Sequence, residues 1–202
     1  MNFVSDPDDV VVKPTKSIQK LSIQKAIEPY QLAQSRNDYS TSDIKQFMSS
    51  KTYSLMTTRF SDSTWQEFAK SGARRYSVST PIAKSVPSDG NCIVIEMNNT
   101  ENRIMGIGFI KNYIRPQKVH IHDNHHYNRY NYRCERRIYR DNMTIEEDEI
   151  MCRLESHCFY GKTNLKRPAG ITLFPAWFLY AIHIEFGIDV TPLIANMFNT
   201  RI

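Results

Sequence analysis

A largely apolar run at residues 92–97 constrains the fold of this chain more than any other part of its sequence. The run reads Cys-Ile-Val-Ile-Glu-Met, and the polar residues that follow, 98–102, are typical of a tight turn. Residues 103–114 are again mostly apolar, so the chain is expected to return as the second strand of a β-hairpin. Gly106 and Gly108 weaken this second strand, and strands use such glycines for sharp coiling or close backbone approach. We therefore expect a strongly bent sheet around the hairpin.

Local patterns predict further strands and helices on both sides of the hairpin. We expect strands at residues 51–59, 76–80, 119–123, 130–140 and 171–174. We expect helices over residues 43–50, 64–72, 144–159 and 176–186, and a last short helix from Thr191. Alternation along 130–140 places one set of side chains on a common face: Tyr130, Tyr132, Cys134, Arg136 and Ile138. Together these elements predict an α+β protein, a small, strongly bent β-barrel with flanking helices.

Capping signals predict where several helices begin and end. Ser42 is a good N-cap for the first helix. Thr64 and Thr144 each precede a glutamate by three residues, which is the pattern of a capping box. Pro175 is expected at the first position of a helix that Gly187 ends.

Residues 1–41 differ from the rest of the chain. They contain few apolar side chains and repeat Ser-Ile-Gln-Lys at 17–20 and 22–25. Such a segment cannot form a core alone, so it is either a flexible tail or an arm that orders on a neighbouring subunit. We divide the chain into an extended arm with a short lead-in helix (residues 1–50), a barrel domain (51–175) and a C-terminal helical hairpin packed on the barrel (176–202).

Several classes of protein are disfavoured by features that the sequence lacks. The longest apolar stretch, residues 171–186, is interrupted by His183 and Glu185, so no membrane span is expected. The four cysteines follow no disulfide framework, which favours reduced thiols in an intracellular compartment. There is no nucleophile elbow, P-loop or dinucleotide fingerprint, so we expect neither an enzyme nor a cofactor.

Residues 120–126 form a dense cluster of side chains that could bind metal. The run nearly matches the H-x-H-x-D-H pattern of metallo-β-lactamase-like hydrolases, but Asn124 stands where that pattern needs Asp. Simple metal binding is an alternative. We favour a polar loop and expect no metal site.

Basic residues gather in the middle of the chain. Its net charge is +5, but residues 103–140 alone contain nine basic and two acidic side chains, and residues 141–155 contain six acidic and one basic. Adjacent blocks of opposite charge favour two distinct contact surfaces. The alternative is that the two blocks neutralise each other within the fold.

Within the basic block, arginines are interleaved with tyrosines. Arginines bind phosphates and tyrosines stack on bases, so this composition favours a nucleic-acid surface with its charges outside the core. A tyrosine-rich surface that packs against another protein is the alternative. The candidate contacts are Arg129, Tyr130, Tyr132, Arg133, Arg136, Arg137 and Arg140, together with Lys162, Lys166 and Arg167 from a second basic run.

Two parts of the sequence resemble known proteins. Residues 76–81, 91–99 and 104–108 resemble the first strands of PUA-like barrels, the group that includes EVE and YTH domains. Residues 154–175, together with 127–130, resemble uncharacterised proteins of large double-stranded DNA viruses. The first resemblance implies an aromatic pocket for a modified base, for which the candidates are Tyr53, Trp65 and Tyr76.

The second resemblance implies a non-enzymatic viral protein, either a nucleic-acid reader or a virion component. We predict a nucleic-acid-binding protein that contacts phosphates and bases of DNA or RNA through its Tyr/Arg-rich surface. The alternative is a structural virion protein that docks neighbouring subunits, its own copies or other virion proteins, through residues 1–41 and the tyrosine-rich surface. Both predictions place the protein inside the host cell (cytoplasm, viral factory or nucleus) or in the virion, without a membrane partner.

Overall fold

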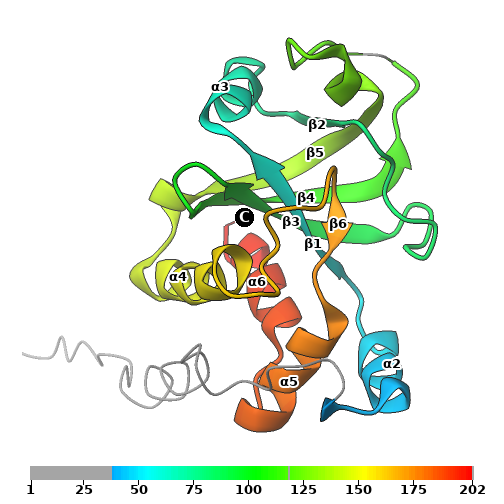
Figure 1. Ribbon diagram of the computed structural model, residues 1–202, viewed down its shortest axis with the longest axis vertical. Coiled ribbons are helices and arrows are strands. Elements are labelled where there is room, and N and C mark those ends of the chain that lie inside the picture. Colours follow the sequence, from blue (N-terminus) through cyan, green and yellow to red (C-terminus); the bar gives the residue numbers. More distant parts are fainter. Residues whose placement is uncertain (1–37, 118, 202) are drawn as a thin grey trace, which may run out of the picture.

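A curled six-stranded sheet forms the centre of the protein. In the computed structural model, which describes residues 38–117 and 119–201, this sheet has the shape of a half-barrel and is accompanied by five helices (Figure 1). The predicted α+β class is therefore confirmed. The predicted arm, residues 1–41, lies outside the described residues except for its last four residues.

The predicted hairpin lies in the middle of the sheet. The strands are β1 (Ser54–Phe60), β2 (Arg75–Val78), β3 (Asn91–Asn98), β4 (Arg103–Ile114), β5 (Tyr130–Tyr139) and β6 (Thr172–Leu173), and their order is β2-β5-β4-β3-β1-β6. β3 and β4 form the hairpin, and β1 runs parallel to β3. β6 pairs only with Met56 and Thr57. Beyond Thr57, β1 is therefore itself one edge of the half-barrel, and β2 is the other edge.

Both faces of β3 are buried, which explains why its sequence is a continuous apolar run. Ile93 and Ile95 belong to a cluster that includes residues from α4 to α6, whereas Cys92 and Val94 belong to a cluster that includes Phe68 of α3. Figure 1 shows the same division: α4 and α6 lie against one side of the curled sheet and α3 lies at the other. Strands covered on both faces lack the usual alternation of polar and apolar residues.

Gly108 allows a tyrosine to cross closely over β4. A Cβ atom at this position would lie 1.9 Å from the hydroxyl oxygen of Tyr76 and 3.1 Å from the sulfur of Cys134. The close approach predicted for this glycine is therefore confirmed, and it lets the ring of Tyr76 pack in the cluster that contains Phe68 of α3.

The predicted strand at residues 119–123 is not formed. The backbone N–H groups of Ile121 and His122 both donate to the side-chain oxygen of Asn128, at 2.9 and 3.0 Å. The chain from residue 119 to 129 is therefore a loop, containing a short 3-10 turn (His125–Asn128), that is held by one asparagine side chain instead of a strand ladder. Asparagine side chains commonly replace backbone partners in this way.

A β-bulge separates side chains that we expected on one face of β5. Phe109 pairs with Arg136 and Ile110 pairs with Cys134, so Glu135 is an extra residue in the strand. Because side chains alternate, one extra residue moves the rest of the strand to the opposite face. Tyr132 therefore packs with the α3 cluster, whereas Ile138 packs with the α4–α6 cluster.

Most helices begin within a few residues of their predicted positions, although some caps differ. The helices are α2 (Thr41–Ser49), α3 (Asp62–Lys70), α4 (Ile145–Phe159), α5 (Ala176–Phe186) and α6 (Val190–Asn199). Thr144 forms its predicted capping box with Glu147. The N-cap of α2 is Ser40 instead of Ser42, and the capping box of α3 is formed by Ser61. Pro175 is the N-cap of α5, not its first residue, and Gly187 ends α5 as predicted.

The last two helices form a corner instead of the predicted hairpin. α5 and α6 are bent by 95° relative to each other, so α6 packs near β5 while α5 runs beside α2 (Figure 1). Within the described residues, no single helix has the length and apolar content for a membrane crossing, although α5 and α6 taken together pass that test as a bent pair.

Candidate functional site

Two of the predicted phosphate-binding arginines lie inside the protein. The Nε and Nη2 atoms of Arg137 donate to a carboxylate oxygen of Glu96 at 2.9 and 2.5 Å, and the guanidinium lies 4.3 Å from the ring centre of Phe68. The same carboxylate oxygen accepts from the hydroxyl of Tyr76. Burial raises the pKa of Glu96, and Arg137 acts against this shift. The expectation that Arg137 lies outside the core is therefore wrong.

Arg140 is also buried, with 6% of its surface exposed. Its guanidinium forms ion pairs with Asp148 and, at 2.8 Å, with Glu155, and it donates to the backbone oxygen of Ile104 at 3.1 Å. It therefore joins β4 to α4. Here the basic and acidic blocks of the sequence neutralise each other, and Arg140 is not available to phosphate.

Other predicted contacts are also engaged within the fold. Tyr132 is fully buried and accepts a hydrogen bond from the backbone N–H of Ile82. Arg136 is exposed, but its guanidinium stacks against Phe109 and Phe198 and donates to the backbone oxygen of Phe198. Lys166 donates to the side chain of Asn102 at 2.7 Å. Exposed side chains remain at four other candidates: Arg129, Arg133, Lys162 and Arg167. Tyr130 is half-buried and packs against the α3 cluster.

The three aromatic residues predicted to form a base pocket do not meet. Tyr76 is 1% exposed, and Trp65 packs against Phe60 with the ring centres 5.3 Å apart. Tyr53 lies on the other side of the sheet, with its ring centre 6.1 Å from that of Phe109. The prediction fails because side chains of this size fill the two cores, as buried aromatic residues commonly do.

A different pocket lies where the two edges of the half-barrel face each other. It has a volume of about 310 Å³ and we call it the seam pocket. Its lining comes from residues 58–61 and 64, 78–79, 99, 122, 127 and 167–170. Residues 58–60 belong to the edge of β1 and Val78 ends the edge strand β2, so the pocket lies at the open seam of the sheet.

The loop at 119–129 brings Tyr127 and His122 to the seam pocket. Asn128 holds the loop closed through its bonds to the backbone of Ile121 and His122. His122 is buried and its Nδ1 lies 2.8 Å from a carboxylate oxygen of Glu67 on α3. The ring of Tyr127 meets the ring of His122 edge-on, with centres 5.9 Å apart and planes at 83°. Tyr127 is 42% exposed, so part of its ring is open to a ligand.

Arg59 holds the opposite wall, the segment from Leu165 to Gly170. Its Nε donates to the backbone oxygen of Leu165 at 2.6 Å, and its Nη1 donates to that of Gly170 at 3.2 Å. Nη2 donates to the hydroxyls of Thr57 and Thr172. Burial lowers the pKa of Arg59 to about 10, and all of its partners are neutral. The pocket wall therefore contains a cation that no carboxylate compensates.

Gly170 lets this wall pass close to the end of β2. Its φ angle is +74°, and a Cβ atom would lie 2.6 Å from the hydroxyl oxygen of Thr80. Such a backbone conformation favours glycine. The result is that Arg167, an exposed residue of the second basic run, lines the same pocket as Tyr127.

The seam pocket is electropositive. It is lined by two arginines and, within the described part of the chain, by no aspartate or glutamate. Its polar groups include the hydroxyls of Ser61, Thr64 and Ser79, and the side-chain oxygen of Asn99, which is buried without a hydrogen-bond partner. An unpaired buried acceptor is unusual in a folded protein and is satisfied when a ligand or water donates to it. The chemistry suits a ligand that carries negative charge and hydrogen-bonding edges.

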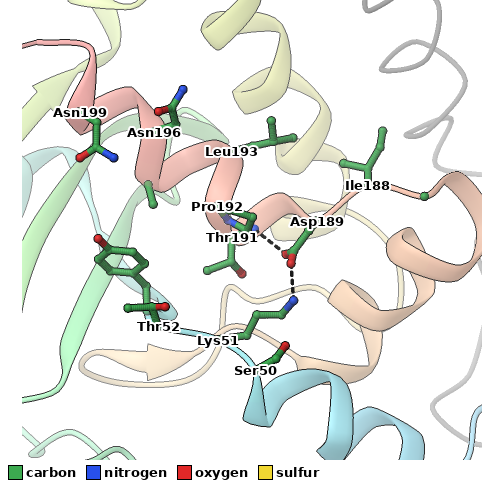
Figure 2. Close-up of a pocket in the computed structure, with 13 residues that line it drawn as sticks. Ser50, Lys51, Thr52, Ile188, Asp189, Thr191, Pro192, Leu193, Asn196 and Asn199 are labelled. Atoms are coloured by element: carbon green, nitrogen blue, oxygen red, sulfur yellow. Dashed lines mark hydrogen bonds and ion pairs between the residues drawn. The ribbon is translucent and has the colours of Figure 1, made fainter.

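A larger hollow, of about 720 Å³, lies beside the start of α6 (Figure 2). Figure 2 shows Lys51 pointing at Asp189, with which it forms an ion pair, while Asp189 also accepts from the backbone N–H of Thr191 and so caps α6. Among the described residues that line the hollow, the charged ones are these two, and they neutralise each other. The first turn of the helix already has its partner in Asp189. This hollow therefore offers no charge to attract a ligand.

The histidine-rich loop does not assemble a metal site. Between residues 38 and 201, residue 118 excepted, no three His, Cys, Asp or Glu side chains are grouped to hold an ion. The rings of His120 and His125 lie 4.7 Å apart, His122 pairs with Glu67, and His126 contacts Arg129.

Comparison with protein families finds no matching family model, and comparisons with curated proteins and with solved structures find no match either. The seam pocket is therefore interpreted from its own chemistry. Arg167 was one of the predicted contacts. Tyr127 lies in the predicted basic and aromatic segment but was not singled out, and Arg59 and Asn99 were missed. A lone arginine inside an otherwise uncharged strand is the one local signal that singles out Arg59.

Proposed function

We propose that this protein binds nucleic acid and receives a base or nucleotide of a single strand in the seam pocket. The observation that carries the proposal is that Tyr127 and Arg167, forty residues apart in sequence, line one pocket whose described lining contains no carboxylate. Tyr127 belongs to the interleaved basic and aromatic segment and Arg167 to the second basic run, the two parts of the sequence that favour nucleic-acid binding. The PUA-like (EVE/YTH-type) assignment and an origin in a large DNA virus remain part of this proposal and rest on the sequence resemblance.

Each wall of the pocket has a distinct role in this proposal. The exposed part of the Tyr127 ring stacks on a base, an interaction worth roughly 1–3 kcal/mol per base. Arg167 contacts phosphate or a base carbonyl, because a guanidinium presents a planar fork of donors. The Asn99 oxygen and the hydroxyls of Ser61 and Thr64 form hydrogen bonds with the base edge. A base inside a duplex cannot reach such a pocket, so the ligand is a single strand or a flipped base.

The test is equilibrium binding of fluorescently labelled single-stranded DNA and RNA to the full chain at about 150 mM salt. We expect Tyr127→Ala and Arg167→Ala each to weaken binding by roughly tenfold, which corresponds to about 1.4 kcal/mol. Tyr160→Ala and Arg103→Ala are matched controls, because both side chains are exposed and lie outside the pocket. Equal affinity in the pocket variants and the controls would refute the proposed role of the pocket.

The assembly function is the second candidate, because exposed tyrosines also occur away from the pocket. Tyr113, Tyr139 and Tyr160 have between 39% and 61% of their surface exposed. This function predicts no oligonucleotide affinity at the same salt, and loss of self-association or of co-sedimentation with a partner when these tyrosines are replaced. Both assays can be run on the same protein sample, and their results distinguish the two candidate functions.

A further inference from the structure

Three arginines gather on the outer face of the sheet, near the edge strand β2. Arg75 of β2 is directly opposite Arg133 of β5 in the antiparallel register. The next residues in register, Tyr76 and Tyr132, are both buried in the α3 cluster. Because successive side chains alternate, Arg75 and Arg133 project from the opposite face. Like charges directly opposite each other destabilise a sheet, so the pair is unfavourable unless an anion compensates it.

Arg115, directly after the end of β4, adds a third positive charge. Ile114 pairs with Tyr132, and the backbone N–H of Arg115 donates to the oxygen of Asn131 at 2.9 Å. By alternation, Tyr113 and Arg115 then lie on the same face as Arg133. The guanidinium of Arg115 lies 5.0 Å from the ring centre of Tyr113, which is 45% exposed.

These arginines have unused hydrogen-bonding capacity. Nη1 of Arg75 and Nε of Arg115 are buried atoms without a partner, and the one side-chain bond of Arg75 is to Gln117 at 3.4 Å. Within residues 38–117 and 119–201, no carboxylate lies in ion-pair distance of Arg75, Arg115 or Arg133. A site with three cations, free donors and no counter-ion matches the needs of a phosphate.

We propose that Arg75, Arg115 and Arg133, the outer arginine cluster, bind the phosphate backbone of the strand whose base enters the seam pocket. β2 connects the two sites, because Arg75 begins the strand and Val78, at its end, lines the pocket. Three residues of strand span ~10 Å, about the length of three stacked nucleotides. Since β2 is an edge strand, a single strand can pass around it from one face to the other. This inference rests on the proposed function.

Tyr113 is the feature that favours nucleic acid over an acidic protein. An exposed tyrosine ring beside an arginine offers a stacking surface for a base, together with the donors that hold its phosphate. An acidic peptide needs only the charges.

The test compares the salt dependence of binding for the wild type and for Arg75→Ala/Arg133→Ala, using a labelled single strand and an abasic strand of equal length. Each lost phosphate contact should reduce the slope of log affinity against log salt concentration by about 0.7. The slope measured for the double variant should therefore be about 1.4 smaller than that of the wild type, with either oligonucleotide. Lys45→Ala/Arg103→Ala removes two exposed cations, one on α2 and one at the start of β4, and should leave the slope unchanged. Thermal melting should show that the Arg75/Arg133 variant is as stable as the wild type, because it removes a like-charge pair.

The outcomes separate this inference from the proposed function. If the Arg75/Arg133 variant keeps the wild-type slope while Tyr127→Ala weakens binding of the base-containing strand, the outer cluster is not a phosphate site and the pocket proposal stands. If the wild type binds poly-glutamate but neither strand, the cluster serves an acidic protein partner and both proposals fall. Absence of binding to all three probes also overturns both.

Discussion

Arg137 should be essential for stability, although the sequence places it in a segment that favours nucleic-acid binding. Its guanidinium and the fully buried carboxylate of Glu96 form a two-donor ion pair, with 7% and 0% of the two side chains exposed. Removing one partner of a buried ion pair leaves an uncompensated charge, which typically costs about 3–5 kcal/mol. We therefore expect Arg137→Met to lower the free energy of unfolding by this amount.

For a chain of this size, such a loss lowers the melting temperature by on the order of 10 °C. Urea unfolding followed by circular dichroism gives the free energy, and a thermal scan gives the shift. Arg133→Met is the matched control, because Arg133 is an exposed arginine of the same strand, and it should change stability by less than about 0.5 kcal/mol. Adding Glu96→Gln to Arg137→Met should recover part of the loss, since the buried charge is then removed. A stability of Arg137→Met equal to that of Arg133→Met would refute the buried pair.

Three further predictions concern the fold. Burial beside Phe178 lowers the pKa of His157 to about 4, below its unfolded value of 6.5. The contribution of His157 to stability is therefore full above pH 6.5 and falls by ~1.4 kcal/mol per pH unit between pH 6.5 and about pH 4. His157→Phe should remove this part of the pH dependence in acid titrations of unfolding. Gly108→Ala should cost about 1–3 kcal/mol by urea unfolding, because the new methyl meets the Tyr76 hydroxyl; an unchanged midpoint would contradict the close crossing. Thr144→Ala should cost about 1 kcal/mol by the same measure, because it removes the cap of α4, and a loss below about 0.3 kcal/mol would argue against that cap.

The parts of the fold that were predictable from sequence are those with local signals. The hairpin of β3 and β4 follows from an apolar run, a polar turn and a second apolar run, and α4 follows from its capping box and its apolar spacing. The predicted strand at residues 119–123 is wrong because Asn128, several residues away, supplies the hydrogen bonds that a strand ladder would otherwise provide. The face assignment along β5 failed because the bulge at Glu135 has no signature of its own in the sequence.

The candidate site was predictable only in part. The interleaved basic and aromatic segment contributes Tyr127 to the pocket, and the second basic run contributes Arg167. Nothing local indicates that these two residues meet, since the closure of the half-barrel brings them together. Arg133 is exposed, whereas Arg137 and Arg140 are paired with buried or half-buried carboxylates. The composition of the basic block does not indicate which of its arginines are exposed and which are paired. That distinction depends on which glutamates and aspartates face the strand after folding.

Photocrosslinking locates the bound ligand on the protein and is therefore the decisive test of the seam pocket. A single-stranded oligonucleotide with a photoreactive base is bound to the full chain at about 150 mM salt, irradiated and digested, and the crosslinked peptides are identified by mass spectrometry. Our account predicts that the principal crosslink lies on the peptide that contains Tyr127, and that Tyr127→Ala abolishes it while Tyr160→Ala leaves it intact. A principal crosslink in the α5–α6 region, or the absence of any crosslink under conditions where a control nucleic-acid-binding protein reacts, would contradict it.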